Sequence, residues 1–105
     1  MSRNLAKFQV GQIIHHKLFD YSGIIFDIDP KFLGSEEWYE TMARSKPPRD
    51  EPWYHVIVHQ ALHTTYVAEQ NLEPAKEQHE ISNPLISEFF EEFDGTCYKL
   101  RQKFN

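Results

Sequence analysis

Short apolar segments with the periodicity of β-strands dominate the first 74 residues of the chain. Residues 8–16 and 21–29 are rich in β-branched and aromatic side chains, and so are residues 53–59 and 62–68. Because such side chains suit a pleated, half-buried backbone, each segment predicts a strand. The links within each pair are short, so the four segments predict two antiparallel hairpins. A 3₁₀ turn and a brief fifth strand around Leu72 are expected to follow.

Residues 31–52 interrupt this pattern and predict an insertion with a short helix. Ser35 is a suitable N-cap, and Trp38 and Met42 lie four residues apart, on one face of the helix that would follow. The proline-rich residues 46–52 then end the helix, because proline lacks the N–H that a helix interior requires. This part of the insertion is expected to be extended and exposed.

The C-terminal part predicts an amphipathic helix over residues 83–94, after a polar linker. Asn83-Pro84 is a helix start, and Asp94-Gly95 follows as its end. Between them the large apolar residues form one helical stripe at i, i+1, i+4, i+5 and i+8, opposite several glutamates. Such a stripe either covers the open end of a β-barrel or packs on a neighbouring subunit or partner.

The whole pattern predicts one mainly β domain spanning residues 1–105, with a small antiparallel barrel of about five strands over residues 7–74. A chain of this length buries enough surface to fold alone. Gly23 lies early in the second strand, where a missing side chain permits a bulge or a close backbone approach that bends the sheet. Residues 53–59 form the third predicted strand, and their side chains alternate between its two faces. Because both faces carry large apolar side chains, both are expected to be packed.

The composition of the chain indicates which kinds of partner and which cellular compartment to expect. The net charge is −5, and it is uneven: residues 69–94 hold eight acidic residues and only one basic residue, Lys76. Cys97 is the single cysteine, so no internal disulfide forms and a reducing compartment is expected. No apolar run approaches the roughly 18 residues of a membrane span. We expect a cytoplasmic protein with no membrane partner.

The sequence offers no recognisable catalytic constellation, so no enzyme activity, cofactor or metal is expected. It contains no nucleophile elbow, phosphate-binding glycine loop or complete zinc-ligand pattern. His59 and His63 supply only half of such a pattern. Asp27 and Asp29 share a strand face before a proline and are expected to solvate the strand end. His55 is interpreted as a buried or half-buried hydrogen-bonding residue rather than a catalytic one.

Several quoted segments together carry a family resemblance. The chain reads FQVGQIIHHKLFDYSGIIFDIDP over residues 8–30, EPWYHVIV over residues 51–58 and TTYVAEQNLEP over residues 64–74. In this order, and with a variable insertion after the first, they resemble the bacterial HspQ heat-shock family, also classed as YccV-like hemimethylated-DNA-binding proteins. The structural signature of the resemblance consists of Gly11, Gly23, Trp53, Tyr54 and His55.

The resemblance implies a fold, a function and partners. The fold is a small SH3-like, strongly bent barrel that self-associates as a dimer or trimer. The function is cytoplasmic proteostasis without catalysis, in which the protein promotes degradation of denatured or regulatory proteins by a Lon-type ATP-dependent protease. The alternative is binding of hemimethylated DNA with an effect on replication initiation. Residues 59–62 and the Phe-rich C-terminal segment depart from the family pattern.

Candidate residues for contact with a partner or with DNA combine cationic and aromatic side chains outside the acidic segment. Cations would neutralise phosphates, and tyrosine rings would stack on bases. These candidates are Lys17, Tyr21, Lys31, Arg44, Lys46, Arg49 and Tyr66. Because acidic residues lie among them, and because the total charge is negative, a protein partner is the preferred interpretation.

Overall fold

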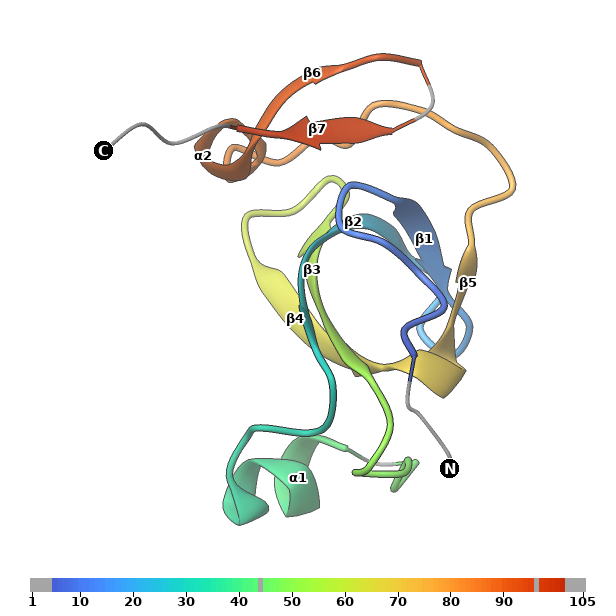
Figure 1. Cartoon of the computed structure of the whole chain (residues 1–105), viewed down its shortest axis with the longest axis vertical. Helices are drawn as coiled ribbons and strands as arrows, with labels where there is room; N and C mark the ends of the chain where they lie inside the picture. The colour runs from blue at the N-terminus through green and yellow to red at the C-terminus, as the bar shows by residue number, and fades with distance from the viewer. Residues whose placement is uncertain (1–4, 44, 96, 102–105) are drawn as a thin grey trace.

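Five strands form one antiparallel sheet, and the sheet bends around a packed core (Figure 1). The computed structural model describes residues 5–43, 45–95 and 97–101. The hydrogen-bonded order is β4-β3-β2-β1-β5, so β4 and β5 are the edges. The strands are β1 (Ile13–His16), β2 (Ser22–Asp29), β3 (Trp53–Val58), β4 (Thr64–Ala68) and β5 (Leu72–Pro74). The predicted mainly β class is confirmed, including both hairpins and the brief fifth strand.

The inner face of the sheet carries the central apolar cluster. Alternation along the strands turns Ile25 of β2 and its register partner Val56 of β3 to this face, together with Tyr54. The N-terminal segment adds Phe8, whose ring meets that of Tyr54 edge-on. The buried members of this cluster are Phe8, Ile14, Ile25, Tyr54, Val56, Val67 and Leu72.

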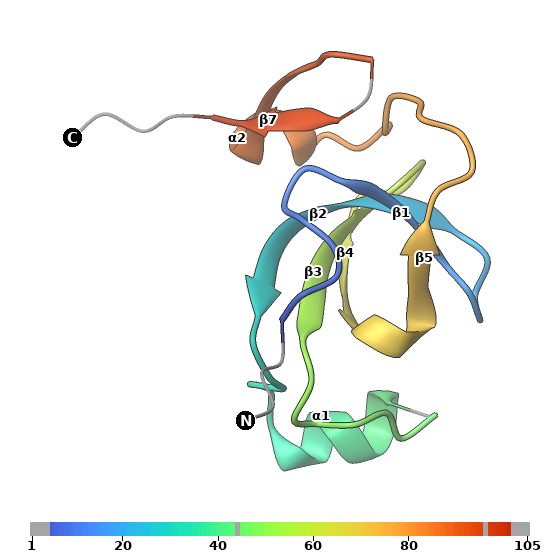
Figure 2. The same ribbon diagram turned by 45° about the vertical axis from the view of Figure 1, so that its right-hand side comes forward.

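The 3₁₀ helix η1 (Glu69–Asn71) carries the chain from one sheet edge, β4, to the other edge, β5 (Figure 2). Glu69 is buried, and its carboxylate accepts hydrogen bonds from the Tyr54 hydroxyl and, at 2.8 Å, from the backbone N–H of Lys7. A buried carboxylate is costly unless hydrogen-bonded. These bonds therefore fix η1 and the N-terminal segment to β3.

The sheet bends at two different features of β2. A Cβ added at Gly23 would lie 2.5 Å from the carbonyl oxygen of Ile57, so the expected close backbone approach is confirmed at this glycine. The register shift of the β2–β3 ladder lies further along, between Ile25 and Asp27, where Phe26 is the extra residue. Such a bulge increases the local twist and redirects the side chains that follow it.

The insertion covers one end of the outer face of the sheet. Its helix α1 (Glu36–Met42) begins as predicted, because the Ser35 hydroxyl accepts the backbone N–H of Trp38 at 3.0 Å. Tyr39 packs with Trp53 in a buried cluster that also holds Ala43 and Ala68. The insertion is thus part of the packed structure. Within the described residues, no helix has the length and apolarity needed to cross a membrane.

The helix expected over residues 83–94 is wrong except for a single turn that begins at Ile86. The helix α2 covers only Ile86–Phe89, and the chain then extends into β6 (Phe90–Phe93). This strand pairs with β7 (Tyr98–Leu100) as an antiparallel hairpin that covers the other end of the sheet (Figure 1). Phe90 of β6 and Tyr98 of β7 are buried in a second cluster on the outer face of the sheet. The buried members of this cluster are Ile13, Ile24, Ile57, Ile81, Phe90 and Tyr98.

Local chemistry explains why the hairpin replaces a longer helix. Asp94-Gly95, interpreted above as a helix stop, lies in the hairpin loop, and Gly95 has a φ of +99° that glycine adopts without strain. In a continued helix, Glu88 and Glu91 would lie one turn apart, where like charges repel. The extended backbone also brings Tyr98 against Phe90, which is fully buried.

Gly11 provides the contact on which this hairpin rests. Its carbonyl accepts the backbone N–H of Tyr98 at 3.1 Å, and its φ is +91°. A Cβ at this position would lie 2.3 Å from the carbonyl oxygen of Tyr98. Gly11 therefore permits a close backbone approach that any larger residue would prevent.

Both faces of β3 are packed, as its alternation predicts. Trp53 and Ile57 lie in the two outer clusters, whereas Tyr54 and Val56 lie in the inner one. His55 is half-buried between the two outer clusters, and its Nε2 donates a hydrogen bond to Asp29 at 3.0 Å. The interpretation of His55 as a half-buried hydrogen-bonding residue is confirmed.

Replacing Trp53 with alanine is expected to lower the free energy of unfolding by roughly 3–5 kcal/mol, because a large buried ring leaves a cavity. Trp53 is 1% exposed and its ring contacts those of Phe32 and Tyr66. Urea unfolding followed by circular dichroism measures this loss. Trp38→Ala, at a half-buried position, is the matched control and should cost less. An unchanged unfolding midpoint for Trp53→Ala would contradict the packing role.

The tyrosines Tyr54 and Tyr66 are expected to make the fold sensitive to alkaline pH. Burial, and then a hydrogen-bonded carboxylate, raise the pKa of both phenols above its ordinary value of about 10. The folded state therefore keeps protons that the unfolded chain loses, and stability falls as the pH rises above about 10. Unfolding midpoints measured from pH 8 to pH 11 test this. Tyr54→Phe should make the decline shallower, and an unchanged slope in that variant would contradict the assignment.

Candidate functional site

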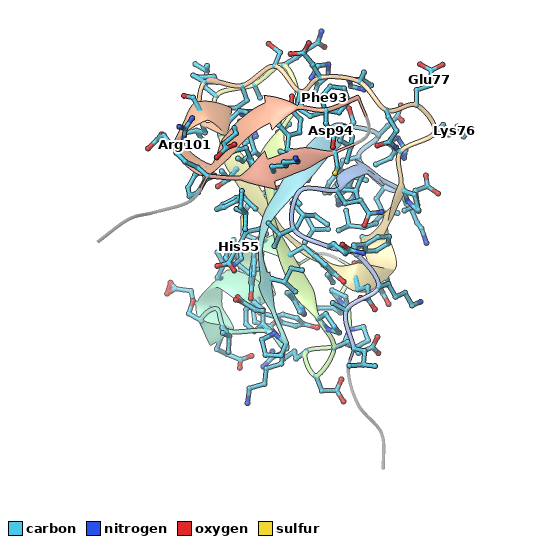
Figure 3. All side chains as sticks on the ribbon, turned by 45° about the horizontal axis from the view of Figure 1, so that its top comes forward. His55, Lys76, Glu77, Phe93, Asp94 and Arg101 are labelled. Carbon is cyan, nitrogen blue, oxygen red and sulfur yellow. The ribbon has the colours of Figure 1, made fainter. Side chains whose placement is uncertain are left out.

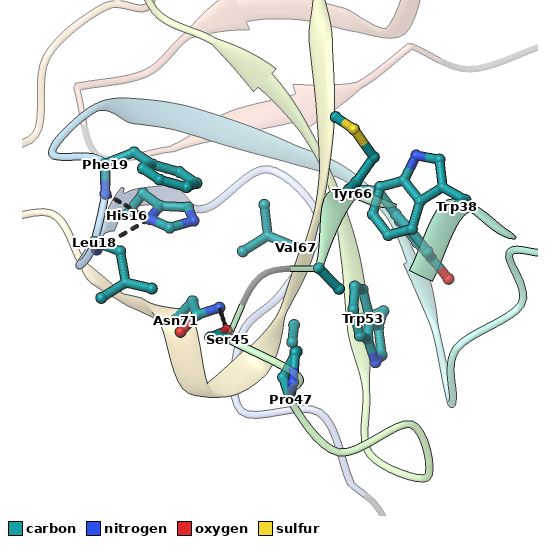
Figure 4. Close-up of a pocket in the computed structure, with 13 residues that line it drawn as sticks. His16, Leu18, Phe19, Trp38, Ser45, Pro47, Trp53, Tyr66, Val67 and Asn71 are labelled. Carbon is teal, nitrogen blue, oxygen red and sulfur yellow. Dashed lines mark hydrogen bonds between the residues drawn. The ribbon is translucent and has the colours of Figure 1, made fainter. Parts of the chain in front are cut away.

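A hollow of about 320 Å³ lies between the β1–β2 turn and the wall formed by α1 and β4 (Figure 4). His16, Leu18 and Phe19 stand on one side, and Trp38 and Tyr66 on the other. A neighbouring hollow of about 530 Å³ continues along β4 past Thr64 and Thr65. The two hollows, together called the aromatic groove, share His16, Phe19, Trp38, Met42, Tyr66 and Val67.

The β1–β2 turn presents two apolar side chains at this groove. The Nδ1 atom of His16 accepts the backbone N–H groups of Leu18 and Phe19, each at 3.1 Å. Burial lowers the pKa of His16, so the ring stays neutral and able to accept at neutral pH. Asp20, with a φ of +54°, completes the turn. Leu18 and Phe19 remain 58% and 66% exposed.

The opposite wall is held by a network of rings and hydrogen bonds. The Trp53 indole N–H donates to the Pro48 carbonyl at 3.1 Å, and the Tyr66 hydroxyl donates to Asp29 at 2.6 Å. The ring of Tyr66 lies 5.1 Å from that of Trp53 and 5.6 Å from that of Trp38. These contacts hold the rings of the wall against one another, while Met42, which also lines the groove, is 59% exposed.

The predicted cationic candidates are not gathered at the groove. Arg49 forms a two-point ion pair with Glu36, at 2.7 and 2.5 Å, and its guanidinium lies over the Tyr39 ring. Lys46 pairs with Glu40 at 3.1 Å.

Lys17 and Lys31 are exposed, and among the described residues neither has an ion-pair partner. They lie at different places, Lys17 in the β1–β2 turn and Lys31 at the start of the insertion, near Phe32 and Gly34. Arg44 lies outside the described residues. The predicted cations therefore do not form one stripe over the part of the chain that is described.

Two aromatic candidates do line the aromatic groove. Tyr21 donates or accepts a 2.7 Å hydrogen bond with the Thr65 hydroxyl, which links the start of β2 to β4. Tyr66 lies on the groove wall. Sequence reasoning missed Leu18 and Phe19, although two large apolar residues in a hairpin turn are themselves a signal of an exposed contact.

The histidines His15, His16 and His59 take part in separate hydrogen bonds. Adjacent His15 and His16 point apart: His15 contacts Asp20 and Glu73, each at 2.7 Å, and these carboxylates raise its pKa. The ring of His59 accepts the Ser82 backbone N–H at 2.9 Å. Over the described residues, the group whose donor atoms are close enough for a metal is Asp27, Asp29 and His55.

Comparisons with known proteins place this chain in a family. The family model described as "Hemimethylated DNA-binding protein YccV like" matches residues 6–97. F-box only protein 21 of Homo sapiens and of Pongo abelii is 34% identical over 93 residues, and the Mus musculus protein is 33% identical. Each alignment covers 87% of this chain but 15% of the relative, so the chain spans only a small part of the curated relatives it matches.

The sequence resemblance and the family model agree on the same region of the chain. The quoted segments run from residue 8 to residue 74, and the family model extends over the bent sheet, the insertion and β6, the first strand of the C-terminal hairpin. The chain belongs to the YccV-like hemimethylated DNA-binding family.

Proposed function

We propose that this chain is a non-enzymatic protein-binding factor of cytoplasmic proteostasis. It promotes degradation of denatured or regulatory proteins by a Lon-type ATP-dependent protease, and the aromatic groove holds an apolar segment of the client or of the protease. The observation that carries the proposal is the exposure of Leu18, Phe19 and Met42 around a wall of packed aromatic rings. Large apolar side chains that converge at a hollow are typical of a protein-binding surface.

The position of β4 supports an extended peptide as the occupant. β4 is an edge of the sheet, and the consecutive residues Thr64, Thr65, Tyr66 and Val67 line the groove. A peptide beside an edge strand gains main-chain hydrogen bonds, while adjacent hollows take its alternate side chains. Denatured proteins present such apolar, extended segments, so this mode of binding needs little sequence specificity.

Charge also favours a protein partner over a nucleic acid. The net charge is −5, and Lys46 and Arg49 are already paired with acidic residues of α1. Phosphate binding depends on several cations on one surface. The groove wall offers aromatic area instead, which an apolar client segment can cover. The resemblance also implies self-association as a dimer or trimer, and this belongs to the same proposal.

Phe19→Ser combined with Met42→Ser is expected to weaken client capture tenfold or more. Each substitution removes apolar area that contributes roughly 1 kcal/mol when partly buried by a peptide. Both side chains are largely exposed, so the fold should persist. The measurement is the rate at which a purified Lon-type protease degrades a labelled, denatured protein, with and without this chain.

Leu62→Ser provides the matched control for the degradation assay. Leu62 is 79% exposed and lies in the β3–β4 link, outside the residues that line the groove. This variant should enhance degradation as well as the original chain does. If the original chain leaves the degradation rate unchanged over a broad concentration range and with several substrates, the proposed function is wrong.

Hemimethylated DNA is the second candidate partner, favoured by the description of the family to which the chain belongs. If DNA is bound, a fluorescence titration with hemimethylated duplex should show affinity that falls steeply with salt, because several phosphates release counterions. Lys17→Ala combined with Lys31→Ala should reduce that salt slope by about 2. Absence of binding by micromolar protein at low salt would exclude this candidate.

A further inference from the structure

Two carboxylates and an imidazole meet on the outer face of the sheet, between its two covers. They belong to Asp27 and Asp29 of β2 and His55 of β3, and their donor atoms all lie within 4.8 Å of one another. Figure 3 shows His55 between the C-terminal hairpin and α1. The sequence suggested these residues separately, as a solvated strand end and a structural histidine, and the protein-binding proposal uses Asp29 only to hold Tyr66.

The bulge in β2 creates this arrangement. Because Phe26 is the extra residue, Asp27 lies directly opposite His55, and Asp29 lies opposite Trp53. Residues two apart on a strand share a face, so both carboxylates project on the side of the sheet that carries His55. Without the bulge the register would place Phe26 opposite His55 and turn the aspartates to the other face.

Neighbouring rings hold the cluster in place. The His55 ring lies 4.5 Å from the Tyr66 ring and 5.8 Å from the Phe26 ring. The Tyr66 hydroxyl donates to Asp29 at 2.6 Å and itself accepts the Leu33 backbone N–H at 3.1 Å. Hydrogen bonds of this kind orient ligating carboxylates in metal sites.

We propose that Asp27, Asp29 and His55 bind a divalent transition-metal ion, for which Zn²⁺ is the best match. Zinc takes one imidazole and two carboxylates at about 2.0–2.2 Å. His55 Nε2 and Asp29 Oδ2 are 3.0 Å apart, a spacing that suits two adjacent ligands of one ion. Asp27 is exposed, so its carboxylate can rotate toward that ion.

The charge balance of the cluster favours a cation. Within the described residues no lysine or arginine forms an ion pair with either aspartate, and His55 is the one partner in an ion-pair geometry. The Asp29 side chain is only 16% exposed and the His55 side chain 34%. A divalent ion would neutralise both carboxylates at a site where water screens them incompletely.

A bound ion would have two consequences. It would tie β2 to β3 next to the bulge, where the ladder of hydrogen bonds is interrupted. Three protein ligands would also leave a coordination position for water or for a group of a partner. His55 and Tyr66 line the aromatic groove, so the ion would lie at the edge of the groove. The site does not depend on the proposed function, because the ion binds with no client present.

Competition with a chromophoric chelator for Zn²⁺ tests the site on the full chain. We expect one equivalent of Zn²⁺ to bind, and Co²⁺ to give visible absorption bands in the same place. Asp27→Asn should weaken binding at least tenfold while preserving the side-chain oxygen that accepts the Ile28 N–H. His55→Gln should do the same, and melting curves without metal will show whether either variant folds.

Asp20→Asn is the matched control, because Asp20 contacts the other histidine that lies between two carboxylates, His15. This variant should bind Zn²⁺ as the original chain does. Zn²⁺ should also raise the melting temperature of the original chain and leave that of Asp27→Asn unchanged. Failure to bind one equivalent, or equal weakening by Asp20→Asn and Asp27→Asn, would overturn the proposal.

Discussion

Burial of β3 on both faces is the constraint on which the rest of the structure depends. Its inner side chains, Tyr54 and Val56, need the bent sheet, and its outer ones, Trp53 and Ile57, need separate covers. A single five-stranded sheet cannot bury both faces at once. The insertion and the C-terminal hairpin therefore belong to the core, although neither is part of the five-stranded sheet.

A polar cluster formed by Asp27, Asp29 and His55 lies on the outer face of the sheet between the two covers. Apolar clusters end at Phe26 on one side and at Tyr66 on the other, with His55 between them. A half-buried polar group in this position needs a hydrogen-bonding partner, and Asp29 supplies it. The same Tyr66 that closes the apolar cluster orients this carboxylate, so packing and polar chemistry are coupled through one side chain.

The aromatic groove arises from the same requirement for a cover. α1 places Trp38 against the sheet beside the edge strand β4, and the β1–β2 turn faces it from the other side. The acidic side chains of α1 meanwhile pair with Lys46 and Arg49, which removes these cations from any anionic partner. The family description names DNA, whereas the groove is lined by apolar and aromatic side chains, of which Leu18, Phe19 and Met42 are exposed.

The sequence predicted the strands, the Ser35 cap, a bulge or close approach at Gly23 and the two-sided packing of β3, because residue type and periodicity along the chain carry these signals. The C-terminal hairpin was beyond such reasoning: the Phe-rich stripe fits a helix equally well, and only burial of Phe90 against Tyr98 and the backbone of Gly11 favours extension. The groove and the Asp27–Asp29–His55 cluster were equally inaccessible. Both join residues that lie far apart in the sequence, and in the cluster a one-residue bulge, which the tertiary structure alone decided, turns Asp27 and Asp29 to the face of His55.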